Sequence, residues 1–157
     1  MPDSVCWLLN IRGTDVPHTP FVLAFAILNA DASVDLFLDA KKTTPELLTH
    51  LGNEVRLRAP DQFGPALDAF KDKSVLADPQ WAAAFIFDRL HHAGAKIVRA
   101  SDPCQLPKAC KNEAELAGTR RAHIRDGQAL SRFLAWFAQN APKGGLTEID
   151  TVKKLEG

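Results

Sequence analysis

The chain has 157 residues and a mass of 17.2 kDa, with 46% hydrophobic and 24% charged residues, a composition typical of a folded globular protein rather than a disordered chain. Nineteen basic residues balance nineteen acidic ones, so net charge gives no reason to expect a nucleic acid or anionic membrane as partner. The longest apolar run covers residues 21–28, far short of the about 20 residues that span a bilayer. Three scattered cysteines and no recognisable secretion signal favour a reducing cytoplasm.

Six short segments that are apolar or alternate in polarity are predicted to be strands: residues 4–11, 21–29, 34–38, 54–58, 74–77 and 96–99. The second and third are joined by a turn and should form a hairpin. Helices are predicted over 44–52, where Thr44 and Pro45 form a start signal, and over 61–70 and 78–94. Three successive strands followed by strand–helix alternation predict an α/β fold, a six-stranded mixed sheet flanked by helices.

The character of the sequence changes after residue 103, so we expect one domain over 1–103 and a second segment over 104–157. A long helix is predicted from Glu113 to Gln139, with Ile124, Leu130 and Leu134 on one apolar face. A short helix follows, opened by a capping-box-like Thr147. The sequence stops about three turns into that helix, which we interpret as an excerpt from a longer protein. An uncovered apolar face also predicts a homodimer.

The loop after the first predicted strand carries the candidate functional residues Arg12, Asp15 and His18. Ligands often bind at strand ends in α/β sheets, and an Arg can hold a carboxylate through two parallel hydrogen bonds. The alternative, which general base rates favour, is a structural loop closed by an Arg12–Asp15 pair with His18 merely polar.

Three other groups of polar residues are better explained by structure than by chemistry. Adjacent histidines on a helix point in different directions, two cysteines six apart would need two further metal ligands, and a basic stretch balanced by acids is a solvated face. These groups are His91 with His92, Cys104 with Cys110, and Arg120, Arg121, His123 and Arg125. The isolated aspartates Asp31, Asp35 and Asp39 form no paired carboxylates at a recognisable spacing.

Three segments, in order, resemble the three-domain form of aminopeptidase P (Xaa-Pro aminopeptidase), a peptidase M24 family within the creatinase/prolidase superfamily. The first is similar to the start of that enzyme's second domain, and the others to its junction with the catalytic domain. The matching residues are Asp3, Ser4, Val5, Trp7, Leu8, Asn10, Ile11, Arg12, Gly13, Asp15, Val16 and Pro17; then Lys111, Asn112, Glu115, Ala122, His123, Arg125, Asp126 and Gly127; then Gly144, Gly145, Leu146, Thr147 and Glu148.

The resemblance implies a creatinase N-terminal domain with a ribonuclease-H-like layout. It also implies a cytoplasmic, dimeric parent enzyme that uses two Mn²⁺ or similar ions to remove the N-terminal residue of short peptides with proline in second position. The family's metal ligands (two Asp, one His and two Glu) lie downstream of the last helix, so Asp126 and Glu148 are not among them. We therefore expect this chain alone to be inactive, with no catalytic residue, metal ligand or cofactor of its own.

Within such a parent, Arg12, Asp15 and His18 are placed by the resemblance near the active-site entrance, where they would admit short peptides. Two alternatives stay open. The chain could be a stand-alone, non-enzymatic binding or dimerisation module of the same fold, or a portion of a prolidase or creatinase relative with other chemistry.

Overall fold

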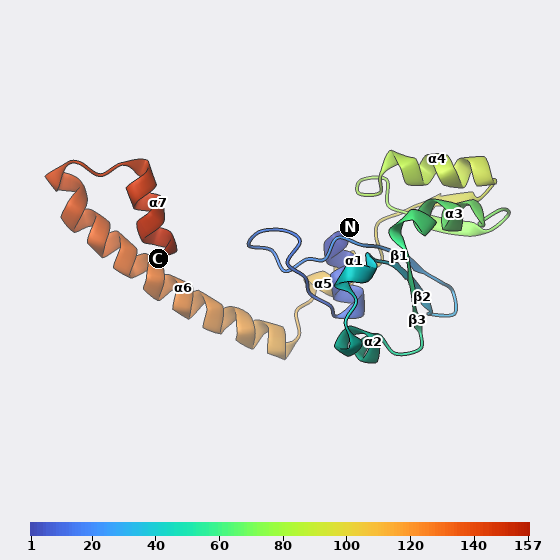
Figure 1. Ribbon diagram of the computed structural model, residues 1–157, viewed down its shortest axis with the longest axis horizontal. Coiled ribbons are helices and arrows are strands. Elements are labelled where there is room, and N and C mark those ends of the chain that lie inside the picture. Colours follow the sequence, from blue (N-terminus) through green and yellow to red (C-terminus); the bar gives the residue numbers. More distant parts are fainter. The chain divides into compact units, whose positions relative to one another are not determined.

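A computed structural model describes residues 1–157 and contains seven α-helices, three 3-10 helices and five strands of four residues each (Figure 1). The chain divides into two units, Met1–Ala109 and Cys110–Gly157. The first unit contains α1 (Pro2–Leu9), β1 (Phe25–Leu28), β2 (Val34–Phe37), η1 (Ala40–Lys42), α2 (Pro45–Leu51), β3 (Val55–Arg58), η2 (Pro60–Gln62), α3 (Phe63–Asp68), β4 (Ser74–Ala77), α4 (Ala84–Ala93), β5 (Lys96–Arg99) and α5 (Gln105–Ala109). The second contains α6 (Glu113–Asn140), η3 (Ala141–Lys143) and α7 (Glu148–Glu156).

The segment predicted as the first strand is the helix α1, so that prediction is wrong. Pro2 occupies the first helical turn and Asp3 adds an acidic side chain there, both favourable at a helix start. Cys6 is buried on the inner face of this helix. The helix ends at Asn10, whose left-handed conformation (φ 49°) lets its amide donate to the Trp7 carbonyl. The large apolar residues therefore serve a helical face rather than a strand.

The mixed α/β fold is confirmed, but the single six-stranded sheet is not. One sheet has the order β1-β2-β3, with β1 antiparallel and β3 parallel to β2, and the other consists of parallel β4 and β5. The hairpin predicted between residues 21–29 and 34–38 is confirmed as the β1–β2 pair. Because the segment predicted as the first strand forms α1, five of the six predicted strands remain. Side-chain packing, through Val75 of β4 and Ile97 of β5, joins the second sheet to a cluster it shares with the first.

Both faces of strand β2 are buried, which shows that this strand lies at the centre of the first unit. Leu36 and Leu38 face a cluster with α1 and α2, whose buried members are Val5, Cys6, Ile11, Val22, Leu36, Leu38 and Leu51. Phe37 faces the opposite cluster with α3 and α4, whose buried members are Phe37, Phe63, Leu67 and Leu90. A strand covered on both faces reads as a continuous apolar run, as this one does except at Asp35.

Two further contacts close the first unit. The Asp78 carboxylate, directly after β4, accepts hydrogen bonds from the amides of Gln80 and Asp102, both at 2.8 Å, and so joins the loops that follow β4 and β5. Lys108 of α5 forms an ion pair with Asp3 of α1. The first unit therefore extends beyond the expected boundary at residue 103 to the end of α5. The sequence analysis did not predict this helix.

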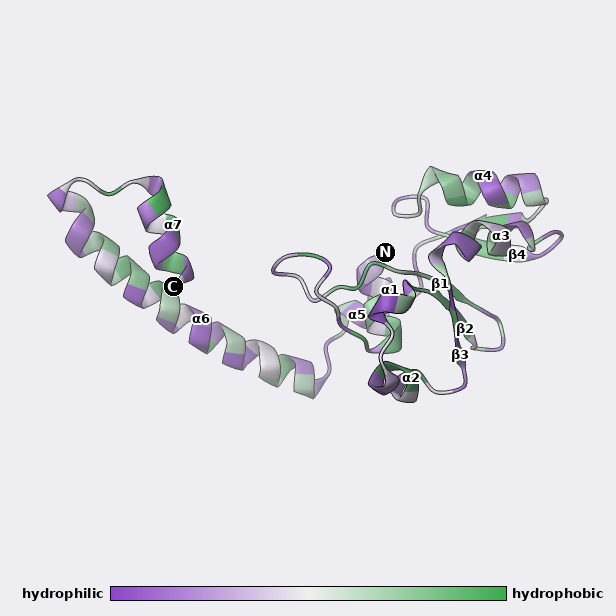
Figure 2. Cartoon of the chain, in the orientation of Figure 1, coloured by the Kyte–Doolittle hydropathy of each residue, from purple (hydrophilic) through white to green (hydrophobic).

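The second unit is a helical hairpin in which each α-helix begins with a complete capping box, and the box at Thr147 was predicted from the sequence. The Asn112 side chain accepts from the Glu115 amide at 2.9 Å, and Thr147 pairs in the same way with Asp150. Bands of hydrophobic and hydrophilic residues alternate along α6 (Figure 2). Its apolar face is open to solvent, with Ile124 64% and Leu134 54% exposed. No helix combines the length and the apolar content needed to cross a membrane.

Candidate functional site

The candidate residues lie in a loop over residues 12–20, directly after α1, which we call the 12–20 loop. It folds back as a narrow hairpin because the amides of Gly13 and Asp15 donate to the carbonyls of Pro20 (3.3 Å) and Phe21 (3.2 Å). A Cβ on Gly13 would lie 2.8 Å from the Val22 backbone, closer than atoms pack without a shift. Glycine is therefore required at this crossing for steric reasons.

His18 stands at the tip of the 12–20 loop in a strained conformation. The Thr19 amide donates to the Val16 carbonyl at 3.2 Å, and His18 has a φ of 59°. With Pro17 before it, this is the pattern of a type II turn, whose third position normally takes Gly or Asn. His18 is exposed, so nothing in the core requires an imidazole at this position.

Asp15 holds the 12–20 loop to two other parts of the first unit. Its Oδ2 atom accepts a hydrogen bond from the Leu23 amide at 2.7 Å and from the Lys42 ammonium at 2.5 Å. The hydrogen bond from Lys42 and then that from Leu23 hold the pKa of Asp15 below its ordinary value. The predicted Arg12–Asp15 pair is therefore wrong, since the cationic partner is Lys42, 27 positions away.

Arg12 is bound to the main chain instead of to a carboxylate. Its Nη1 donates to the Ile11 carbonyl at 2.8 Å and lies 3.5 Å from the Cys6 carbonyl, near the end of α1. Positive charge at a helix C-terminus is stabilising. One edge of the guanidinium is thus fixed by the backbone, while Arg12 as a whole stays exposed.

A hollow of about 260 Å³ lies beside the 12–20 loop. Four apolar side chains and the two cations contribute to its lining, together with Gly13, Thr14 and Asp15. The apolar and cationic members are Ile11, Val22, Leu38, Leu47, Arg12 and Lys42. Arg12 and Asp15 therefore both border the hollow. His18 is not part of its lining.

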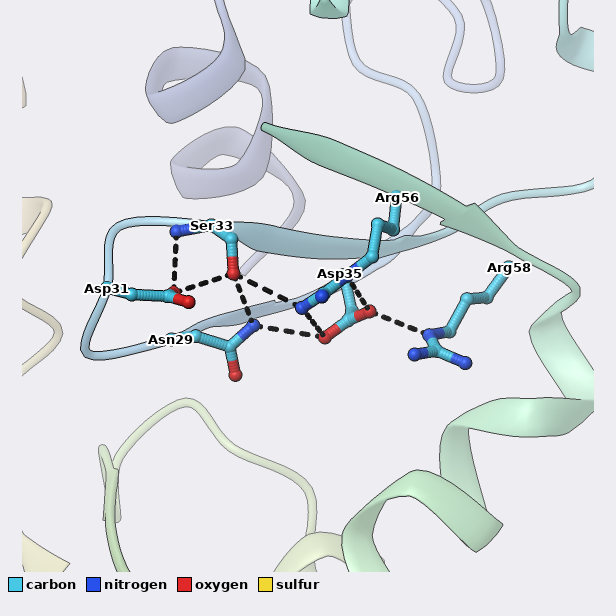
Figure 3. Close-up of polar contacts among 6 residues, drawn as sticks. All are labelled: Asn29, Asp31, Ser33, Asp35, Arg56 and Arg58. Atoms are coloured by element: carbon cyan, nitrogen blue, oxygen red, sulfur yellow. Dashed lines mark hydrogen bonds and ion pairs between the residues drawn. The ribbon is translucent and has the colours of Figure 1, made fainter. Parts of the chain in front are cut away.

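Figure 3 shows a second polar cluster, which we call the Asp35 network and which consists of Asn29, Asp31, Ser33, Asp35, Arg56 and Arg58. The sequence analysis did not predict it. Asp35 of β2 is only 8% exposed, and its carboxylate accepts from Arg58 Nε (2.7 Å), Arg56 Nε and Nη2 (3.1 and 3.2 Å) and Asn29 Nδ2 (3.0 Å). Burial alone would raise the pKa of Asp35, but the hydrogen bonds from Arg58, Asn29 and Arg56 outweigh burial and lower it. Ser33 completes the network by donating to Asp31 at 2.7 Å.

The Asp35 network follows from the register of parallel strands. Asp35 pairs with Arg56 across β2 and β3, and Arg58 lies two residues further along on the same face. Both carboxylate oxygens of Asp35 accept two hydrogen bonds each, which is the condition for a buried carboxylate to be tolerated. We regard it as a structural cluster.

The other polar groups named in the sequence analysis do not line the hollow. His92 Nδ1 lies 2.6 Å from the Asp88 carbonyl one turn earlier on α4. Cys104 is buried and Cys110 exposed, and neither is in a disulfide. No three His, Cys, Asp or Glu side chains come together in a way that could hold a metal ion.

The first 115 residues match the family model described as "Creatinase/Prolidase N-terminal domain". The chain belongs to this family. The resemblance to aminopeptidase P is confirmed as well. The chain is 36% identical to the probable Xaa-Pro aminopeptidase P of Aspergillus clavatus over 166 aligned residues, and 33% identical to that of Talaromyces stipitatus over 168.

The fold is also similar to that of a solved enzyme. It matches X-prolyl aminopeptidase from Caenorhabditis elegans, described as a cytosolic enzyme with a di-nuclear active site, with a TM-score of 0.81 and 25% identity over 98% of this chain. The match covers 26% of the nematode protein, and each fungal match covers 25% of the fungal protein. The chain thus spans about a quarter of the length of these relatives.

Proposed function

We propose that this chain is the N-terminal-type domain, with the adjoining helical hairpin over 110–157, of a metal-dependent Xaa-Pro aminopeptidase. The observation that carries this proposal is the alignment of 99% of the chain with a probable Xaa-Pro aminopeptidase P. The nematode structure supports it independently through its fold. The substrates are then short peptides with proline in second position.

The proposed role of this chain is non-catalytic. The resemblance implies that the family's metal ligands lie downstream of α7, so the proposal places the two Mn²⁺ or similar ions on other parts of the longer enzyme. We assign no step of the reaction to a metal held here. The contribution of these 157 residues is to bind and orient peptide.

The 12–20 loop is the part of the chain that we place at the active-site entrance. Arg12 supplies a fixed cation, and His18 presents an imidazole at the tip of a strained turn, where Gly would be the ordinary choice. Asp15 acts as a positioning residue, because its carboxylate is occupied by Lys42 and the Leu23 amide.

We further propose that the protein is a cytoplasmic homodimer. The nematode relative is described as cytosolic, which supports the location. The exposed apolar side chains of α6, Ile124 and Leu134 among them, support self-association because large apolar patches mark contact surfaces.

Hydrolysis of the tripeptide Gly-Pro-Leu tests the proposed activity. The protein from the complete reading frame should release glycine in the presence of Mn²⁺ and lose this activity in a chelator, whereas the 157-residue chain should release none. A longer protein that leaves the peptide intact under all metal conditions would contradict the proposal.

Variants of the longer enzyme test the role of the 12–20 loop. Arg12→Ala and His18→Ala should raise KM or change the preferred peptide length while kcat for the shortest peptide is retained. Asp15→Ala should do the same through loss of loop geometry. Lys41→Ala, an exposed residue next to Lys42 but outside the hollow, is the control. Unchanged kinetics in all three test variants would refute the entrance role.

A further inference from the structure

The hollow beside the 12–20 loop has an apolar floor of limited size. Ile11, Val22 and Leu38 are buried members of the core that also line it, with exposures of 4–6%. Its volume of about 260 Å³ is below the about 300–1,000 Å³ of pockets that take drug-sized ligands. The hollow therefore has room for a ligand the size of one small apolar residue.

The rim of the hollow carries an excess of positive charge. Two cations, Arg12 and Lys42, and one acid, Asp15, contribute to its lining. The Asp15 carboxylate is paired with Lys42 at 2.5 Å. Arg12 has no carboxylate partner, so one positive charge is left without a neighbouring negative one. A ligand with a single negative charge and an apolar body complements both features.

Arg12 is also oriented before any ligand arrives. Its Nη1 donates to the Ile11 carbonyl at 2.8 Å, and its Nη2 and Nε form no hydrogen bond within the chain. These two groups form one edge of the guanidinium, the arrangement that holds a carboxylate through two parallel hydrogen bonds. Because the backbone already fixes the opposite edge, less side-chain freedom is lost on binding.

We propose that this hollow binds the C-terminal residue of a short peptide, with its carboxylate on Arg12 and its apolar side chain on the floor formed by Val22 and Leu38. This inference rests on the proposed function and names the peptide group that the entrance recognises. A site for the free C-terminus would select for peptide length, since only peptides of suitable length could reach both this site and the catalytic centre.

The proposal is tested on the 157-residue chain itself by NMR titration with Gly-Pro-Leu and with the same peptide as its C-terminal amide. The free acid should bind about tenfold more tightly than the amide, with shifts at the amides of Gly13, Val22 and Leu38. Arg12→Gln should remove this preference, and Arg12→Lys should retain only part of it. Lys41→Gln removes a charge from the same region but not from the hollow, so it should bind as the wild type does.

Two results would overturn the proposal: equal binding of acid and amide by the wild-type chain, or a preference for the acid that survives in Arg12→Gln. The first comparison needs no variant, so it holds even if Arg12→Gln fails to fold. The test is separable from that of the proposed function. Cleavage of Gly-Pro-Leu by the longer enzyme without a preference for the acid refutes only this inference. A preference for the acid without cleavage refutes only the peptidase assignment.

Discussion

The substitution Asp35→Asn gives the sharpest test of how the first unit is stabilised. It keeps the size of a side chain that is only 11% exposed, but removes the charge that Arg56 and Arg58 share. It also places an NH₂ group where one carboxylate oxygen stood, opposite the donors of these two arginines. Two of the four hydrogen bonds around Asp35 are then lost, because each carboxylate oxygen accepts two of them.

The magnitude follows from what is left behind. Removing one partner of a fully buried ion pair costs about 3–5 kcal/mol. Here Arg56 and Arg58 are 54% and 42% exposed, so water recovers part of their interactions. We therefore expect a loss of about 2 kcal/mol in the free energy of unfolding. For a chain of this length, that corresponds to a fall in Tm of about 4–8 °C.

The effect should depend on pH in a defined direction. The folded-state pKa of Asp35 is below its ordinary value of 3.8, so its contribution to stability is fully present above that value. It is lost as the pH falls through the folded-state pKa. The difference between wild type and Asp35→Asn should therefore be constant near neutral pH and shrink in strong acid.

Urea unfolding followed by circular dichroism, at neutral pH and in steps below pH 4, measures both quantities. Asp61→Asn is the matched control, because Asp61 is exposed and makes no ion pair; it should change stability by less than about 0.5 kcal/mol. A loss below about 0.5 kcal/mol for Asp35→Asn would refute the reasoning, and so would a difference that persists unchanged in strong acid.

Three further predictions concern other parts of the chain. Leu90→Ala, at a side chain with 0% exposure, should cost about 2–5 kcal/mol in urea unfolding, and an unchanged midpoint would contradict the packing described. Asp15→Asn should speed hydrogen exchange at the Leu23 amide and release the Lys42 ammonium from its ion pair. Because the pKa of Asp15 is lowered, the protection of this amide in the wild type should fall only in acid below the ordinary Asp pKa. Amide exchange rates measured by NMR test both expectations. Leu134→Glu on α6 should weaken the proposed self-association, measured by light scattering at several concentrations, and a wild-type chain that is monomeric throughout would refute it.

The sequence predicted elements whose signals are local. Thr44 and Pro45 mark the start of α2, and Thr147 marks the start of α7; the structure confirms each cap. Residues 4–11 were misassigned because large apolar residues suggested a strand, although Pro2 and Asp3 already indicated a helix start. At this position the helix-start residues indicate the structure more reliably than the apolar composition does.

The site was predicted only as far as one loop. Arg12, Asp15 and His18 are neighbours in sequence, but Lys42 reaches Asp15 only because the β1–β2 hairpin returns the chain to this loop. The Asp35 network was missed for the same reason, since its arginines lie 21 and 23 positions further on. A signal did exist: a carboxylate inside an apolar strand needs a partner, and the alternating residues 55–58 place two arginines on one strand face.

The double burial of β2 has a consequence for how the chain is made. The cluster on its Leu36 side uses residues 5–57, whereas the cluster on its Phe37 side is complete only at Ile97. At a synthesis rate of about 5–20 residues per second, the stretch from 58 to 97 takes roughly 2–8 s. During that interval one side of the nascent sheet can close while the Phe37 side stays bare. Apolar surface that is transiently exposed in this way is prone to aggregation, so this interval is the stage of synthesis at which the first unit is most vulnerable.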